Sequence, residues 1–188
     1  MLSDTLKNKK IAVVATDGFE QVELTEPVDA LREAGATVDI IAPKSGTIRG
    51  WDKTDWGKEI PVDHTLADAD PARYDALVLP GGVMNPDKLR MSEDAKRFVR
   101  AFFLDHKPVS AICHGPQILI DCDVVDGRTM TSYPSVRQDL INAGANWVDK
   151  EVVVDQGLTT SRNPDDIPAF IDKTIEEIHE GKHAEQHA

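Results

Sequence analysis

Two adjacent residues, Cys113 and His114, combine the side chains best suited to nucleophilic chemistry. They lie in the stretch PVSAICHGPQILI, residues 108–120, where an apolar run gives way to Gly-Pro. A cysteine thiolate is a nucleophile, and an imidazole beside it can move protons near neutral pH. Free cysteine is also a common packing residue in protein interiors. The position of the pair, between a buried strand and a helix, favours catalysis over packing.

A sharp strand-to-helix turn would hold Cys113 out at the end of the sheet. The backbone N–H groups of the next helix would then point toward the sulfur, and we expect the positive helix end to lower the pKa of the thiol. Only such a turn lets His114 act beside its neighbour, because adjacent side chains in a strand face opposite ways. Cys122, the other cysteine, has no such context and is interpreted as a packing residue.

Two glycines, Gly81 and Gly82, end another apolar run, YDALVLPGG. A backbone without a side chain can approach a reacting group closely. The amides of Gly82 and His114 could therefore offer two donors to a developing oxyanion. The alternative is a tight turn with no ligand.

Glu20 follows the first apolar run, KIAVVAT. A lone glutamate is by default a solvated helix residue, but its position at a strand end favours a role in the site. A carboxyl beside a thiolate would keep its proton and could donate a hydrogen bond to the sulfur. We expect such a pair to titrate as a coupled unit.

The elements that must position these residues alternate between short apolar strands and amphipathic helices. Such alternation predicts a doubly wound α/β fold, with a parallel sheet covered on both faces. Because sites form at the carboxyl ends of parallel strands, Glu20, Gly82 and Cys113 should converge. Pro27 predicts a helix starting at about residue 27, and residues 44–65 predict a hairpin or extended excursion.

The bulk composition is that of an ordinary globular chain. Its 188 residues, 40% hydrophobic and 29% charged, predict one domain over residues 1–188, with a core at about 10–178 and a frayed tail at 179–188. Two cysteines predict reduced thiols, and the net charge of −12 argues against nucleic acid and anionic membrane partners. The polar start, without an apolar signal core, and the short apolar runs predict a cytoplasmic protein.

Five segments resemble the PfpI family of intracellular cysteine hydrolases, in the superfamily of the parkinsonism-associated deglycase. They are AICHGPQILI, DALVLPGG, GFEQVEL, INAGANWVDKEVVVD and LTTSRNPDDIPAF. The resemblance spans about residues 10–178. It implies a flavodoxin-like three-layer sandwich of the class I glutamine amidotransferase type, with a mostly parallel sheet and a short hairpin excursion.

The resemblance also implies roles for individual residues. Cys113 matches the nucleophile at the strand-helix elbow, His114 the adjacent family histidine, and Glu20 the carboxyl that contacts the thiol. A carboxylate from a neighbouring subunit completes the pair in such proteins, and the matching position is Asp87, where Asp replaces the more usual Glu. The partner is then a second copy of the chain, in a homodimer or a hexamer built from dimers.

The function implied is that of a stress-protective cysteine hydrolase, either peptidase-like or a deglycase acting on dicarbonyl-modified proteins. Its substrates would be peptides, glycated proteins or small dicarbonyls. The alternatives are a glyoxalase-like enzyme on small dicarbonyls, and a redox-sensing or chaperone protein in which Cys113 is oxidised instead of turning over substrate. The scheme uses no cofactor and no metal, since the His and Cys residues lack metal-site spacing.

Overall fold

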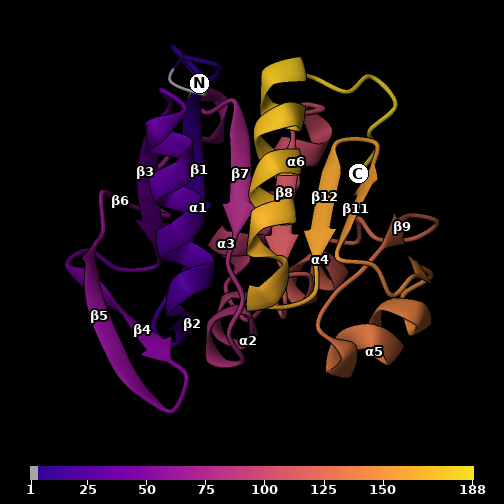
Figure 1. Cartoon of the computed structure of the whole chain (residues 1–188), viewed down its shortest axis with the longest axis horizontal. Coiled ribbons are helices and arrows are strands. Elements are labelled where there is room, and N and C mark those ends of the chain that lie inside the picture. The colour runs from indigo at the N-terminus through magenta and orange to yellow at the C-terminus, as the bar shows by residue number, and fades with distance from the viewer. Residues whose placement is uncertain (1–3) are drawn as a thin grey trace.

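The computed structural model describes residues 4–188, so the first three residues of the polar start lie outside the described residues. A seven-stranded sheet with the order β11-β12-β8-β7-β1-β3-β6 forms its centre, as Figure 1 shows. All neighbours pair in parallel except β11 and β12, which are antiparallel. The strands are β1 (Lys10–Val14), β3 (Thr37–Ala42), β6 (His64–Thr65), β7 (Ala76–Leu79), β8 (Val109–Ile112), β11 (Val152–Asp155) and β12 (Leu158–Ser161).

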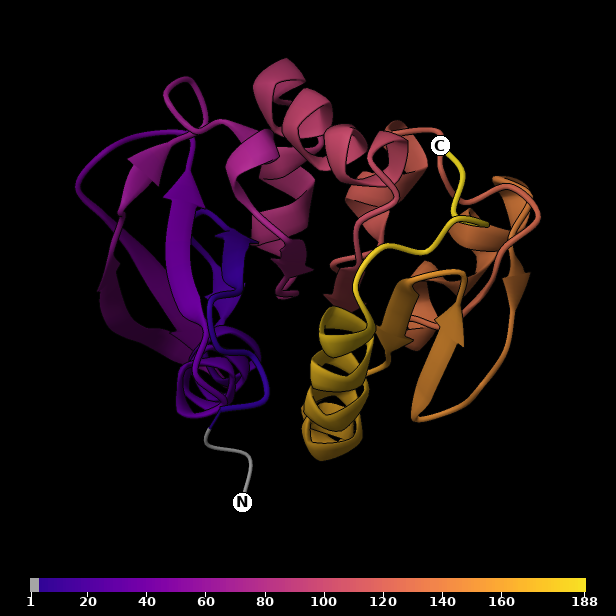
Figure 2. The ribbon, with the colours of Figure 1, turned by 90° about the horizontal axis from the view of Figure 1, so that it is seen from above.

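Helices cover both faces of this sheet, and the predicted α/β class is confirmed. Figure 2 shows α1 (Gln21–Glu33) and α6 (Ile167–Glu180) on one side and α3 (Glu93–Leu104) on the other. The remaining helices are α2 (Met84–Leu89), α4 (Gln117–Asp121) and α5 (Arg137–Asn142), with 3-10 turns at Pro71–Arg73, Pro134–Val136 and Pro164–Asp166. Among the described residues, none of these helices has the length and apolar character needed to cross a membrane.

The period of two along the strands divides the core into two layers. In β1, Ile11 and Val13 belong to the apolar cluster under α1 and α6, while Ala12 and Val14 belong to the cluster under α3. Side chains that alternate between two covered faces must all be apolar. The run KIAVVAT is continuous for this reason.

Two smaller sheets accompany the central one. The predicted excursion at 44–65 is a hairpin of β4 (Thr47–Asp52) and β5 (Asp55–Pro61), and β4 also pairs with β2 (Phe19–Glu20). The second small sheet consists of β9 (Thr129–Met130) and β10 (Asn146–Trp147). The hairpin lies beside the start of α1, at the end of the sheet where β1 stops (Figure 1).

One helix differs from its predicted start, and the helix after Cys113 begins only after a turn. The helix expected from about residue 27 begins at Gln21 and contains Pro27 in its interior. Pro27 forgoes one helical hydrogen bond, but it lies on the buried face with Leu24 and Leu31, and burial of that face offsets the loss. Helix α4 begins at Gln117, because residues 113–116 form a turn.

The tail predicted to be frayed is packed against the body instead. Gln186 is 1% exposed, and His187 offers its backbone carbonyl to the guanidinium of Arg128. Arg128 is itself buried and also donates to the carbonyls of Val124 and Asp155. A buried guanidinium needs acceptors for its donors, and the tail supplies one of them.

Candidate active site

Cys113 lies in a strained turn directly after β8. Its φ is +62°, a left-handed conformation that costs a residue other than glycine about 1–2 kcal/mol. The backbone is held on both sides, since the Cys113 N–H donates to Ser161 at 3.0 Å and its carbonyl accepts from Tyr133 at 2.9 Å. Gly115 completes the turn, because a Cβ there would lie 2.7 Å from the Leu79 carbonyl oxygen.

The carboxyl that meets the thiol is that of Glu23, and the assignment of this contact to Glu20 is corrected. Glu23 is fully buried in the first turn of α1, lies against the Cys113 side chain, and accepts a hydrogen bond from the Gly81 amide at 2.9 Å. Burial raises the pKa of Glu23 to about 8. Oε1 has no other partner among the described residues, which suits an oxygen that carries the proton facing sulfur.

Glu20 lies one helical turn earlier and has a different role. It is the residue before α1, partly buried, and it lines the mouth of the pocket. Its carboxylate accepts backbone hydrogen bonds from Lys53 and Gln21, while burial, its largest influence, raises its pKa. Glu20 therefore ties the tip of the β4–β5 hairpin to the start of α1.

A sequence signal for Glu23 exists in the helical period. Residues 23, 24, 27, 28 and 31 form the buried face of α1, so a glutamate at 23 must be buried with the apolar residues. A fully buried carboxyl is rare without a partner or a function. The expected start of the helix at residue 27 left Glu23 outside this pattern.

The two predicted amide donors converge on the sulfur. The N–H groups of Gly82 and His114 both point to Cys113 and lower the pKa of its thiol. Glycine is required at this edge: a Cβ on Gly81 would lie 2.4 Å from Glu23 Oε2, and one on Gly82, whose φ is +80°, would lie 2.4 Å from the Gly18 carbonyl oxygen.

Burial nevertheless raises the pKa of the Cys113 thiol, and the charge of Glu23 raises it further. The expected lowering by the helix end is therefore corrected, since α4 has five residues and the thiol is 6% exposed. Desolvation disfavours the thiolate more than the amides favour it. Because Cys113 and Glu23 are in contact, the two groups titrate together, and each ionisation belongs to the pair and not to one residue.

His114 bridges the thiol and a serine that the sequence did not indicate. Its Nδ1 lies 3.2 Å from Cys113 Sγ, and its Nε2 lies 3.2 Å from Ser135 Oγ. The ring stacks on Tyr133 with centroids 4.8 Å apart, and burial lowers its pKa. The imidazole is thus oriented and neutral near pH 7. Ser135 is 21 residues away, in the 3-10 turn Pro134–Val136, and the sequence analysis did not single it out.

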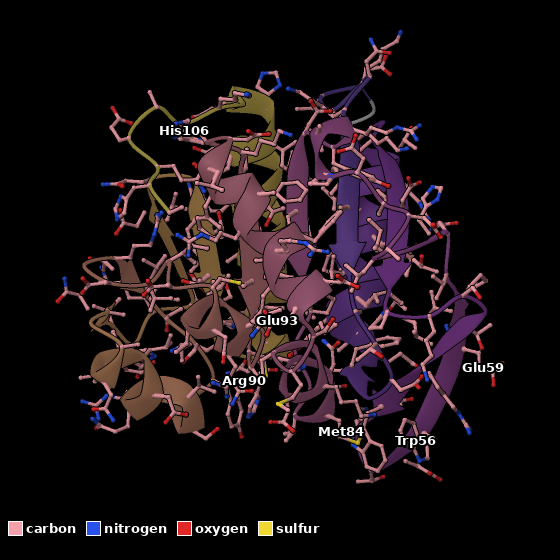
Figure 3. All side chains as sticks on the ribbon, turned by 180° about the vertical axis from the view of Figure 1, so that it is seen from behind. Trp56, Glu59, Met84, Arg90, Glu93 and His106 are labelled. Atoms are coloured by element: carbon pink, nitrogen blue, oxygen red, sulfur yellow. The ribbon has the colours of Figure 1, made fainter. Side chains whose placement is uncertain are left out.

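Asp87 does not meet His114 within one chain. It lies on α2 with its side chain exposed, and it is absent from the residues that line the pocket around Cys113. Its neighbour Met84 does line the pocket, and Figure 3 marks Met84 at the end of the molecule where the hairpin also lies.

The pocket above Cys113 has a volume of about 500 Å³. Trp51 and Lys53 of the hairpin, Tyr133 and Pro164 surround it together with Met84, and both glutamates reach it. A cavity of this size accommodates a small adduct or a single side chain. The walls are mainly apolar, with Glu20, Lys53, His114 and Ser135 as the polar groups that could orient a ligand.

Comparison with known proteins agrees with this arrangement. The DJ-1/PfpI family profile matches residues 9–177. General stress protein 18 of Bacillus subtilis (strain 168) is 51% identical over 164 residues, covering 86% of this chain and 93% of that protein. Deglycase PfpI of Pyrococcus furiosus is 44% identical over 162 residues, covering 86% and 95%.

A solved structure, that of Drosophila melanogaster DJ-1beta, superposes with a TM-score of 0.83 at 31% identity, covering 91% of this chain and 90% of that one. The family match extends over nearly all of the central sheet and both helical layers, from β1 into α6. The chain therefore belongs to the DJ-1/PfpI family.

Proposed function

We propose that the protein is a stress-protective, intracellular cysteine-dependent hydrolase of the PfpI type, acting as a deglycase on dicarbonyl-modified proteins. One observation carries the proposal: the strained Cys113 receives two backbone N–H groups and lies against the buried Glu23 carboxyl. Backbone strain of this kind is kept where it serves a site. The name of the Pyrococcus furiosus relative, a deglycase, supports the same reading.

In the proposed reaction the pair first loses one proton, and the proton that remains moves to Glu23 as the sulfur attacks, because burial has raised the pKa of that carboxyl. The thiolate attacks the aminocarbinol carbon of the adduct, so that the C–S bond forms as the C–N bond breaks, and His114 gives a proton to the amine that leaves. The hemithioacetal left on Cys113 isomerises: a proton moves from its carbon to the neighbouring ketone carbon through an enediolate, whose negative oxygen the amides of Gly82 and His114 stabilise. The product is a thioester of a 2-hydroxy acid, with no external oxidant, and water activated by His114 hydrolyses it. Ser135 fixes the ring through Nε2, so that Nδ1 stays directed at the thiol.

The pocket favours a small reacting group over a peptide segment. The thiol is 6% exposed at the base of a cavity of about 500 Å³, between the hairpin and Tyr133. A peptide bond has chain on both sides, and the pocket would have to admit both. An adduct at the end of a side chain needs room on one side only. The same confinement favours, as a second candidate, the glyoxalase-like conversion of free dicarbonyls.

Assembly is part of the proposal. Asp87 is exposed on α2, and Met84 of the same helix lines the pocket, so a second copy seated there would bring a carboxylate close to His114. A homodimer in which Asp87 of each chain serves the other chain's site agrees with these positions.

Turnover by single-cysteine variants tests the function. We expect Cys113→Ser to abolish release of amine from methylglyoxal-modified lysine peptide, and Cys122→Ser to retain it, because Cys122 packs in the core with its thiol facing Lys96. Circular dichroism spectra should match in both variants. Equal turnover in Cys113→Ser would overturn the nucleophile assignment. Release of lactate from free methylglyoxal, with no amine release, would support the second candidate.

A further inference from the structure

Three ligand-type side chains meet at the far end of α6. Oxygen atoms of Glu177 and Glu180 and a ring nitrogen of His183 all lie within 4.8 Å of one another. The 3-10 turn before α6 begins at Pro164 in the active-site pocket, and the helix then runs 14 residues to Glu180, a length of about 21 Å. The cluster is thus well separated from Cys113.

The two innermost side chains of the cluster, those of Glu177 and His183, lie against each other. The Glu177 side chain is 9% exposed and faces His183 Nε2, with 3.1 Å between the nitrogen and a carboxylate oxygen. His183 Nε2 is itself buried and makes no hydrogen bond with any described residue, despite that short distance. An imidazole lone pair and a carboxylate aimed at the same space fit a shared cation.

The backbone holds the imidazole in position. His183 donates its N–H to the His106 carbonyl at 2.9 Å, and Figure 3 marks His106 beside the C-terminal tail. Gly157, in the turn between β11 and β12, leaves room for the ring, because a Cβ there would lie 2.7 Å from His183 Cδ2. The nitrogen is therefore fixed by the fold.

The local charge also suits a divalent cation. The two carboxylates bring negative charge to the cluster, and the carbonyls at the C-terminus of α6 add partial negative charge. Glu177 is buried, His183 partly buried and Glu180 exposed, so the cluster opens to solvent on one side. Water can complete the coordination there.

We propose that Glu177, Glu180 and His183 form a binding site for a divalent transition metal of the Zn²⁺ type. The nitrogen ligand selects this class, since Mg²⁺ and Ca²⁺ prefer sites made only of oxygen ligands. The expectation that the histidines and cysteines lack metal-site spacing did not include this set. It joins two carboxylates three residues apart on a helix to a histidine beyond the helix end.

The bound metal would fasten the tail to the body. Glu177 and Glu180 belong to α6, whereas His183 begins the segment that continues to Gln186 and His187. One cation shared between them closes that segment over the β11–β12 turn. We expect Zn²⁺ to protect the tail from proteolysis.

Zn²⁺ titration of the full chain by calorimetry tests the site, in a Cys113→Ser background that removes the thiol as a competing ligand. We expect one Zn²⁺ per chain, and affinity reduced about tenfold or more in Glu180→Gln and in His183→Gln. Glu180 is exposed, so its substitution leaves folding intact. The matched controls are Glu176→Gln and His179→Gln, two exposed residues of the same helix that lie outside the cluster.

The outcomes are distinct. Loss confined to Glu180→Gln and His183→Gln, with Zn²⁺-dependent protection of the tail and no heat from Mg²⁺, supports the site. Equal affinity in all four variants would show that Zn²⁺ binds elsewhere and would overturn it. Absence of binding at submillimolar Zn²⁺ would overturn it as well.

Discussion

At the scale of single residues, the chemistry depends on how Cys113 and Glu23 share protons. Both are buried; the charge of Glu23 raises the pKa of the thiol, whereas the hydrogen bond from the thiol lowers the pKa of Glu23, so the two groups titrate as a pair. The amides of Gly82 and His114 lower the pKa of the thiol, and those of Gly81 and Gly82 lower the pKa of the carboxyl. A buried thiol becomes usable in the proposed reaction because its proton can move to Glu23.

Replacing Glu23 by Gln should simplify the titration of Cys113. Gln keeps the size and a donor to sulfur but removes the second ionisation. We expect the rate of Cys113 alkylation against pH to follow one ionisation in Glu23→Gln and a broader, two-step curve in the unsubstituted chain. The measurement uses iodoacetamide, with Cys122→Ser in both proteins. Identical curves would show that Glu23 is not coupled to the thiol.

The same carboxyl predicts a dependence of stability on pH. The pKa of Glu23 is raised from 4.5 to about 8 in the folded chain, so its contribution to stability is fully present below pH 4.5 and is lost as pH rises through about 8. Each pKa unit is worth about 1.4 kcal/mol. We expect urea midpoints to fall less between pH 5 and pH 8.5 in Glu23→Gln than in the unsubstituted chain. Parallel curves would contradict this.

His114 should matter for turnover and little for folding. Its ring transfers protons in the proposed reaction, and such transfer typically contributes about 100-fold or more. We expect His114→Ala to lower kcat by about 100-fold while its circular dichroism spectrum stays unchanged. Ser135→Ala, which leaves the ring present but unheld at Nε2, should lose less. A larger loss in Ser135→Ala would reverse these assigned roles.

At the scale of elements, the site is built at the carboxyl ends of three strands and beside one hairpin. Strands β1, β7 and β8 end at the same edge, so the turns after them bring Glu23, Gly82 and Cys113 together. The hairpin adds Trp51 and Lys53 to the wall, and Glu20 holds its tip through the Lys53 amide. Because parallel strands end at the same edge of a sheet, segments that are distant in sequence line one cavity.

The turn after β7 should tolerate no side chain. Gly82 has a φ of +80°, and a Cβ would come within 2.4 Å of the Gly18 oxygen and 2.6 Å of the Glu20 nitrogen. Both are backbone atoms, so the turn itself must move. We expect Gly82→Ala to lower the free energy of unfolding by at least about 1 kcal/mol and to reduce turnover. Gly127→Ala, also at positive φ but with open space around it, is the matched control for strain alone.

At the scale of the whole molecule, one chain contains the thiol, its carboxyl and both amides, but it leaves Asp87 outside. Asp87 is exposed on α2, the helix whose Met84 lines the pocket. A partner subunit is the proposed source of the carboxylate that reaches His114. In this proposal one chain folds most of the site, and a second chain adds the carboxylate that completes it.

Mixing an inactive variant with a slowed one tests a site shared between chains. We expect Asp87→Ala to slow turnover without changing the mass measured by light scattering. If Asp87 acts across an interface, chains carrying Cys113→Ser should restore activity when refolded together with Asp87→Ala chains. One site in the mixed dimer then has both residues. Activity no higher than that of Asp87→Ala alone would contradict the shared site.

Local pattern was enough to predict the layers, the strands and the edge at which the site forms. Continuous apolar runs such as those of β1 and β7 arise only when both faces of a strand are covered, and the glycines and Cys113 lie where those runs end. These features depend on neighbours in sequence. The α/β class therefore followed from the chain alone.

Only the tertiary structure decided which side chains touch. Glu20 and Glu23 are one helical turn apart, and the direction of α1 across the sheet determines that Glu23 meets the thiol. Ser135 reaches His114 from a distant loop, and the tail is held by the buried Arg128. Such contacts depend on side-chain direction and on the burial of charged groups, which are properties of the packed molecule. The sequence of this protein determined at which end of the sheet the reactive residues lie. The packing of side chains determined which of them are in contact.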